Sequence, residues 1–318
     1  MSNKIKQEIY RIEIPKELSE RSEIGIRKAK KEMQNSKKRY HITSIGIVAC
    51  LLLSMGTFAY FKHDLSYPKE TKNNNIAPIV ANGGGVDIPS IQLPKDGSKA
   101  DMIGLIVYNG KIYTQTSTEL DGENAKAILG QKLGTTKATI DEWSKQQAYD
   151  EEFASTIGIE DVFSVEGYDK DFRIMVYGER DGKPHAGFYE NLNGLTINSG
   201  VDVFGKLKMV GNVSGAEYRT FSDWDNNVDN YHPIANMKIL NDFVKELDKT
   251  KPLPRGENSD PISNSRNNDE FRELTIQLND GTKVKLILLK DGYIYYGYMG
   301  AYFKMKDDIF LSMWGQLQ

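Results

Sequence analysis

The chain has 318 residues, and its 41 Lys and Arg nearly balance its 44 Asp and Glu, which leaves a net charge of −3. Only one cysteine is present, so disulfides within the chain and cysteine-rich metal sites are excluded. The four histidines are scattered and no H-E-x-x-H or G-x-S-x-G motif occurs, so we expect no enzyme, cofactor or metal.

The first 41 residues are basic, with twelve Lys and Arg against six Asp and Glu. They are too few to bury a core of their own, so we expect them to fold on a partner or on a membrane. Pro15 suits the first turn of a helix, and residues 16–33 have helical periodicity. The predicted helix has one mostly apolar face, formed by Leu18, Ser22, Ile26, Ala29 and Met33.

This segment has two interpretations. A basic amphipathic helix often lies on anionic lipid beside a membrane span. Alternatively, its apolar residues dock into a groove on a cytoplasmic protein. In the second case the candidate partner-binding residues are Ile12, Ile14, Leu18, Ile26 and Met33.

Residues 42–61, ITSIGIVACLLLSMGTFAYF, form an uncharged and mostly apolar run. About 20 such residues in a helix match the hydrocarbon thickness of a bilayer, so we predict one transmembrane helix. A cleaved signal peptide would have a shorter apolar core and fewer residues before it. Cys50 lies inside the run rather than at its end, so we interpret it as membrane-facing rather than lipid-modified.

The charge on the two sides of this run predicts its orientation. Basic residues that include Lys37, Lys38 and Arg39 directly precede it, whereas the chain after residue 41 has 29 basic and 38 acidic residues. The basic side should therefore stay in the cytoplasm. The acidic bulk outside should not bind nucleic acid directly, because phosphate would repel it.

The stretch Ile12–Ser22, IEIPKELSERS, and then Ile26–Lys31, IRKAKK, precede this single apolar run. In this order they resemble the N-terminus of bacterial membrane anti-sigma factors. More narrowly, they are similar to negative effectors of extracytoplasmic-function sigma factors from Bacillus relatives. Residues 104–113, GLIVYNGKIY, also resemble outer domains of such proteins. The chain lacks the His-x3-Cys-x2-Cys zinc pattern, so the resemblance implies a zinc-free group.

That resemblance implies a function. In the family the cytoplasmic segment holds a sigma factor away from RNA polymerase, and the outer domain receives a signal. The implied partner is an extracytoplasmic-function sigma factor, together with the membrane and an unknown envelope signal or protease. We expect proteolysis or rearrangement of the outer domain to release the inner segment.

Residues 62–99 are rich in Asn, Pro, Gly and Lys and lack periodicity, which indicates a flexible linker. Gly83 to Gly85 are not followed by Gly-Lys-Ser/Thr, so a phosphate-binding loop is disfavoured.

Strand patterns dominate the rest of the chain. Asn109-Gly110 and Asp181-Gly182 each separate two apolar stretches, as in two-residue hairpins. Near the end, Asp280-Gly281 and Asp291-Gly292 separate three more stretches and predict a three-stranded meander. The predicted strands are 103–107, 111–116, 172–177, 185–189, 274–278, 283–289 and 293–298.

Two helices are predicted, around residues 239–247 and 307–318, from apolar stripes at helical spacing. Helices that follow meanders suggest an α+β fold with helices packed on antiparallel sheets. The predicted organisation is a sigma-binding segment, a span, a linker, an α+β domain, a loop or inter-lobe linker, and a final meander with a helix. These parts comprise residues 1–41, 42–61, 62–99, 100–250, 251–270 and 271–318.

Two further features of the sequence are candidates for ligand binding. Asp223–Asp229 carries alternating oxygen-bearing side chains, but it departs from the EF-hand pattern, so an Asx-rich turn is preferred over a calcium site. The aromatic C-terminal strands suit either a glycan- or partner-binding surface or cross-strand packing, and packing is preferred.

The leading hypothesis is a single-pass cell-membrane anti-sigma factor with an extracytoplasmic sensor domain. The alternative is a membrane-anchored module that binds cell-wall polymer or a peptide without any sigma-factor contact. Deletion of residues 2–33 separates the two, because only the alternative predicts intact function.

Overall fold

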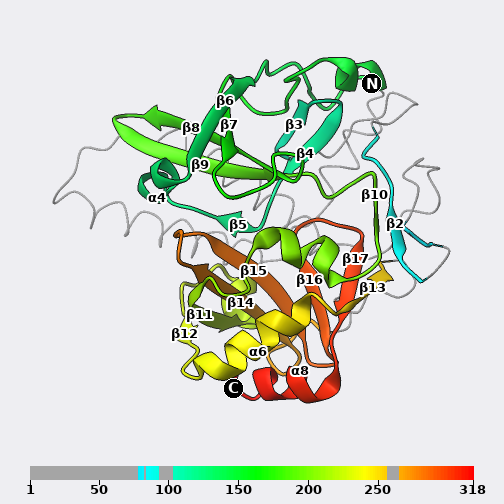
Figure 1. Ribbon diagram of the computed structural model, residues 1–318, viewed down its shortest axis with the longest axis vertical. Coiled ribbons are helices and arrows are strands. Elements are labelled where there is room, and N and C mark those ends of the chain that lie inside the picture. The colour runs from blue at the N-terminus through cyan, green and yellow to red at the C-terminus, as the bar shows by residue number, and fades with distance from the viewer. Residues whose placement is uncertain (1–77, 82–83, 93–102, 256–264) are drawn as a thin grey trace, which may run out of the picture. The chain divides into compact units, whose positions relative to one another are not determined.

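The computed structural model describes residues 78–81, 84–92, 103–255 and 265–318, all within one compact unit that spans Lys72–Gln318. Antiparallel sheets of six, eight and three strands make up most of this unit (Figure 1). Short helices accompany them, so the fold is α+β. Within the described residues no helix has both the length and the apolar character to cross a bilayer; the predicted span 42–61 lies outside these residues.

The six-stranded sheet has the order β3-β4-β9-β8-β7-β6. Asn109-Gly110 and Asp181-Gly182 turn its two predicted hairpins with positive φ at every turn residue, which confirms them. Its strands are β3 (Leu105–Tyr108), β4 (Lys111–Gln115), β6 (Leu129–Thr135), β7 (Asp161–Val165), β8 (Arg173–Arg180) and β9 (Lys183–Glu190).

Residues 153–156 lie along the free edge of β3 and connect it by hydrogen bonds to the residues just after β6. The Val107 amide donates to the Ala154 carbonyl, and the Thr156 amide donates to the Leu105 carbonyl. On its other side the segment accepts a bond from the Lys137 amide at the Phe153 carbonyl. The short helix η1 (Gln146–Asp150) precedes it, and α4 (Gly122–Ala127) packs on a second apolar cluster of the sheet.

The eight-stranded sheet has the order β12-β11-β14-β15-β16-β17-β13, and β5 pairs with the start of β15. Strands from both sides of residues 251–270 meet in it, because β11 pairs with β14. The predicted C-terminal meander is confirmed as β14 to β16. The strands are β5 (Thr118–Glu119), β11 (Val213–Thr220), β12 (His232–Pro233), β13 (Lys251–Pro254), β14 (Phe271–Leu278), β15 (Lys283–Leu289), β16 (Tyr293–Tyr296) and β17 (Ala301–Lys304).

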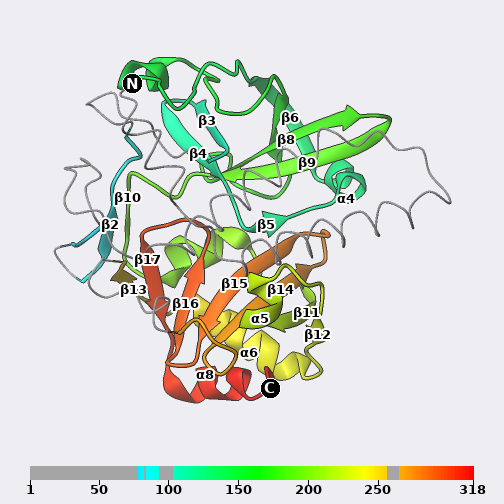
Figure 2. The same ribbon diagram turned by 180° about the vertical axis from the view of Figure 1, so that it is seen from behind.

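Both predicted helices are confirmed, as α6 (Met237–Leu247) and α8 (Asp307–Trp314). They lie side by side at one end of the unit (Figures 1 and 2). The Asn236 side chain begins α6 by accepting bonds from the Lys238 and Ile239 amides. The apolar faces of both helices pack on the eight-stranded sheet and form the main core with it. Three short helices complete this part: η2 (Gly200–Asp202), η3 (Phe204–Leu207) and α5 (Phe221–Asp225).

The three-stranded sheet consists of β1 (Ile79–Val80), β2 (Val86–Ile88) and β10 (Leu195–Ile197), with β2 in the centre. Val86 is 1% exposed and Ile88 is 6% exposed, because both side chains enter the main core. Residues 78–81 and 84–92 lie inside the predicted flexible linker 62–99, so that prediction is wrong for this part of it. The alternating Val86 and Ile88 side chains fill the core, and β2 is held by its pairing with β1 and β10.

Candidate functional site

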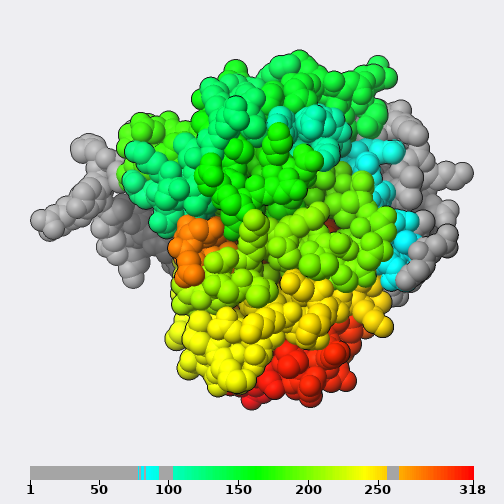
Figure 3. All heavy atoms as spheres, viewed as in Figure 1, coloured from blue at the N-terminus to red at the C-terminus, as the bar shows by residue number. Residues whose placement is uncertain are grey.

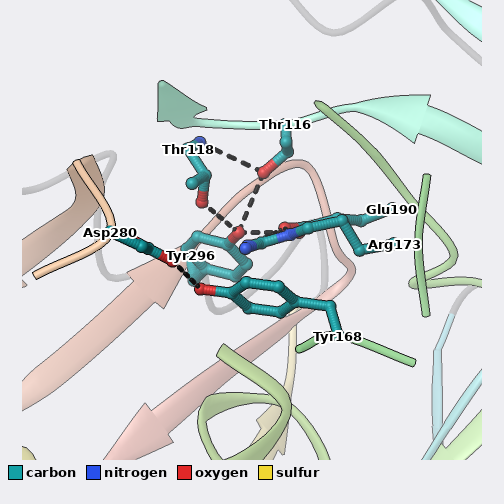
Figure 4. Close-up of polar contacts among 7 residues, drawn as sticks. All are labelled: Thr116, Thr118, Tyr168, Arg173, Glu190, Asp280 and Tyr296. Carbon is teal, nitrogen blue, oxygen red and sulfur yellow. Dashed lines mark hydrogen bonds and ion pairs between the residues drawn. The ribbon is translucent and has the colours of Figure 1, made fainter. Parts of the chain in front are cut away.

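A buried polar cluster lies where the chain passes between the two large sheets (Figure 4). The first passage runs from β4 to β5 and carries Thr116 and Thr118. The second leaves the six-stranded sheet at Glu190, the last residue of β9, and continues to β10. Tyr296, the last residue of β16, meets both passages from the eight-stranded sheet.

Arg173 and Glu190 form the charged centre of this cluster. They are directly opposed on β8 and β9, and both side chains are 0% exposed. The Arg173 guanidinium donates to one carboxylate oxygen, Oε1, from Nε at 3.0 Å and from Nη2 at 2.5 Å. Further hydrogen bonds to the remaining atoms help to offset the cost of burying an ion pair, so the partner of the second carboxylate oxygen matters.

Tyr296 supplies that partner from the other sheet. Its hydroxyl donates to Glu190 Oε2 at 2.6 Å. Because a phenol has a single proton, the Thr118 hydroxyl at 2.6 Å and the Thr116 hydroxyl at 2.9 Å donate to it in turn. Thr118 belongs to β5, so its bond to Tyr296 ties this two-residue strand to β16, in addition to the pairing of β5 with β15.

A second contact between the sheets begins at Tyr168. The Arg173 guanidinium carbon lies 4.4 Å from the centre of the Tyr168 ring and 4.6 Å from that of Phe188. The Tyr168 hydroxyl then donates to Asp280 Oδ2 at 2.9 Å in the β14–β15 turn. In the space-filling view this turn, in orange, touches green residues of the first half of the unit (Figure 3).

The electrostatics of the cluster follow from burial and from the ion pair. Burial raises the pKa of Tyr296 well above its ordinary value, and the Glu190 carboxylate raises it further, so the phenol keeps its proton. Burial lowers the pKa of Arg173, but the charge and hydrogen bond of Glu190, together with Tyr296 and Tyr168, outweigh burial and hold the pKa above its ordinary value. Burial likewise raises the pKa of Tyr168 to about 12.

The cluster can hold two sheets in a fixed relationship. Within the described residues, Arg173 Nη1 has no hydrogen-bond partner, and the ion pair has no exposed surface for a substrate to reach. The Tyr296 hydroxyl joins the eight-stranded sheet to Glu190 of the six-stranded sheet, and the Thr116 and Thr118 hydroxyls hold it in place. The arrangement is therefore structural: it fixes the position of the two large sheets relative to each other.

The predicted partner-binding residues Ile12, Ile14, Leu18, Ile26 and Met33 lie outside the described residues. Asp223 accepts bonds from Thr220 and Asn230 in and beside α5. In the described part of the chain, no three His, Cys, Asp or Glu side chains gather closely enough to bind a metal ion.

The aromatic C-terminal strands divide between core and surface. Tyr296, Tyr302 and Phe303 are buried, which agrees with the packing interpretation for these three residues. Tyr293 and Tyr295 are half-buried beside Tyr302, on the face opposite to Tyr296 and Phe303. Lys304 lies over the Tyr293 ring and Arg255 over the Tyr295 ring. Tyr298 is 59% exposed.

Sequence reasoning missed Arg173 and Glu190, although a signal was present. The two-residue turn at Asp181-Gly182 fixes the register of its hairpin, and that register places Arg173 opposite Glu190. A charged pair at the apolar end of a predicted hairpin is a candidate buried ion pair. The contribution of Tyr296 had no such signal, because it comes from a distant strand.

No protein-family model, curated protein or solved structure matches the chain.

Proposed function

We propose that the chain is a single-pass membrane anti-sigma factor. In this proposal residues 1–41 bind an extracytoplasmic-function sigma factor in the cytoplasm, residues 42–61 span the membrane, and the α+β unit senses conditions outside. The observation that carries it is the uncharged run 42–61 with a basic flank before it and an acidic remainder after it. The identity of the proposed partner, a sigma factor, is inferred from the resemblance of residues 12–31 to anti-sigma factors.

The described unit suits the role of a sensor. It has its own cores, and its two large sheets are joined by a small number of defined polar bonds. A sensor needs an element with two arrangements that a signal can favour differently. A junction between two sheets is such an element, because each sheet keeps its internal pairing when the junction changes.

Co-purification tests this proposal. The full-length chain carries an affinity tag at its C-terminus and is extracted in mild detergent from cells that also produce a candidate extracytoplasmic-function sigma factor. We expect the sigma factor to co-purify with the unmodified chain. Leu18→Glu places a charge on the predicted apolar face and should reduce its recovery at least about tenfold, because a buried charge disrupts an apolar contact.

The matched control is Lys31→Glu on the opposite face of the predicted helix, which should retain the sigma factor. Equal loss in both variants, with both still in the membrane fraction, would support a helix that binds anionic lipid. Absence of any sigma factor from the unmodified chain, across the sigma factors of the source cell, would refute the proposal.

A further inference from the structure

Residues 190–197 connect the buried polar cluster to β2, a strand within the predicted linker 62–99. At one end, Glu190 accepts the inter-sheet bond from Tyr296. At the other end, β10 pairs with β2 through Leu195 opposite Ile88 and Ile197 opposite Val86. One short segment therefore touches both the junction of the sheets and the entry of the chain into the folded unit.

The middle of the segment is firmly held. The side-chain amides of Asn191 and Asn193 both donate to the Ile112 carbonyl, at 2.9 and 2.8 Å. Leu192 between them is 6% exposed and belongs to the main core. The segment is therefore anchored along its length and is not a slack loop.

β2 depends on β10 for its place. The Thr196 hydroxyl donates to Asp87 Oδ1 at 2.5 Å across the pair. Gly85 lies so close to β10 that a Cβ atom would come within 2.8 Å of the Ile197 carbonyl oxygen. Since β1 is only two residues long, β10 supplies the longer of the two ladders that hold β2.

We propose that residues 190–197 couple the arrangement of the two large sheets to the pairing of β2. When the sheets meet as described, Glu190 fixes β10 and β10 holds β2 in the core. When the Tyr296 contact is lost, β10 shifts and β2 pairs less tightly. The coupling itself does not depend on the proposed function. Its regulatory role does: a signal outside would reach residues 42–61 through β2.

Tyr296→Phe is the appropriate probe. Arg173 and Glu190 belong to the same sheet, so their ion pair survives the loss of the tyrosine hydroxyl. The ring of Tyr296 remains to fill the core. The variant thus removes the Tyr296–Glu190 bond between the sheets without leaving an unpaired buried charge.

The experiment measures amide hydrogen exchange by mass spectrometry in the full-length chain in detergent micelles. In Tyr296→Phe we expect the amides of residues 84–92 to exchange about tenfold faster, the factor expected for one hydrogen bond to a charged group. The amides of α6 should exchange as before, since no bond to α6 is lost. Tyr298→Phe, an exposed tyrosine in the neighbouring turn, should change neither region.

Asp87→Ala serves as the direct perturbation of β2 and should accelerate exchange there. If Asp87→Ala does so and Tyr296→Phe does not, the segment transmits nothing and the inference is wrong. If Tyr296→Phe accelerates α6 by the same factor as residues 84–92, the variant weakens the whole fold and the inference is equally refuted. Neither result depends on sigma-factor recovery, so it leaves the proposed function to its own test.

Discussion

The Tyr296 hydroxyl lies 2.6 Å from the Glu190 carboxylate, although the two residues belong to different sheets and are 106 positions apart in the chain. It occupies the carboxylate oxygen that Arg173 leaves open. Each of the two charges in the cluster is thus compensated without solvent.

Removal of Glu190 should be far more harmful than replacement of the whole ion pair. Glu190→Ala leaves the Arg173 charge buried without a counter-ion, so the free energy of unfolding should fall by about 3–5 kcal/mol. The double variant Arg173→Met, Glu190→Leu should lose clearly less, because no charge remains buried. Urea unfolding followed by circular dichroism measures both.

The control for this comparison is the exposed ion pair between Lys238 and Asp242 on α6. Asp242→Ala should change the free energy of unfolding by less than about 1 kcal/mol, because water already screens that pair. A loss as small as this in Glu190→Ala would mean that the Arg173 charge finds another partner.

Alkaline pH should destabilise the fold partly through Tyr168. Burial raises its pKa from 10.0 to about 12, so the folded protein keeps a proton that the unfolded chain has already released. The free energy of unfolding should therefore fall as the pH rises from 10 towards 12. Tyr168→Phe should show a smaller fall over this window and an unchanged slope between pH 7 and pH 9, as measured by urea titrations at each pH.

Absorbance at 295 nm gives an independent check on the same group. In the titration of folded Tyr168→Phe, one fewer phenol should ionise at high pH than in the unmodified chain. Identical alkaline titration curves for the variant and the unmodified chain would contradict the assignment.

Gly200 should not tolerate a side chain. A Cβ atom there would lie 1.8 Å from the Leu247 carbonyl oxygen at the end of α6, so the backbone would have to move. Gly200→Ala should lower the free energy of unfolding by about 1–3 kcal/mol. Gly158→Ala, where a Cβ would meet open space, should stay within about 0.5 kcal/mol, and thermal unfolding distinguishes the two.

The predicted membrane orientation can be tested with single cysteines. Cys50 is the only native cysteine, so Cys50→Ser provides a cysteine-free chain. In that background a membrane-impermeant maleimide on intact cells should label Ser98→Cys and spare Ser36→Cys. Labelling of both after lysis is the control, and the reverse pattern on intact cells would invert the topology.

Local patterns were sufficient to predict much of the sheet structure. The Asn-Gly and Asp-Gly turns have the backbone geometry that their residues favour, and they confirm the hairpins around them. The helix around residues 239–247 was equally clear, because its apolar residues recur at helical spacing. In each of these cases the determining contacts lie close together in sequence.

Pairings between distant segments were not predictable in the same way. β6 has the sequence LGQKLGT, which alternates poorly and contains two glycines, so it was not predicted as a strand. β5 has only two residues, and its place on β15 depends on a pairing across more than half of the unit. The polar cluster forms only after these pairings exist, so its membership required the three-dimensional structure.

The segment 153–156 also restricts how the six-stranded sheet can meet other chains. Its backbone forms hydrogen bonds with the outward-facing amide and carbonyl of Val107 and with the carbonyl of Leu105. The Thr156 hydroxyl accepts a hydrogen bond from the Leu105 amide. An incoming peptide therefore cannot extend the sheet beyond β3 without first displacing this segment. Copies of the protein crowded together are likewise prevented from joining edge to edge at this strand.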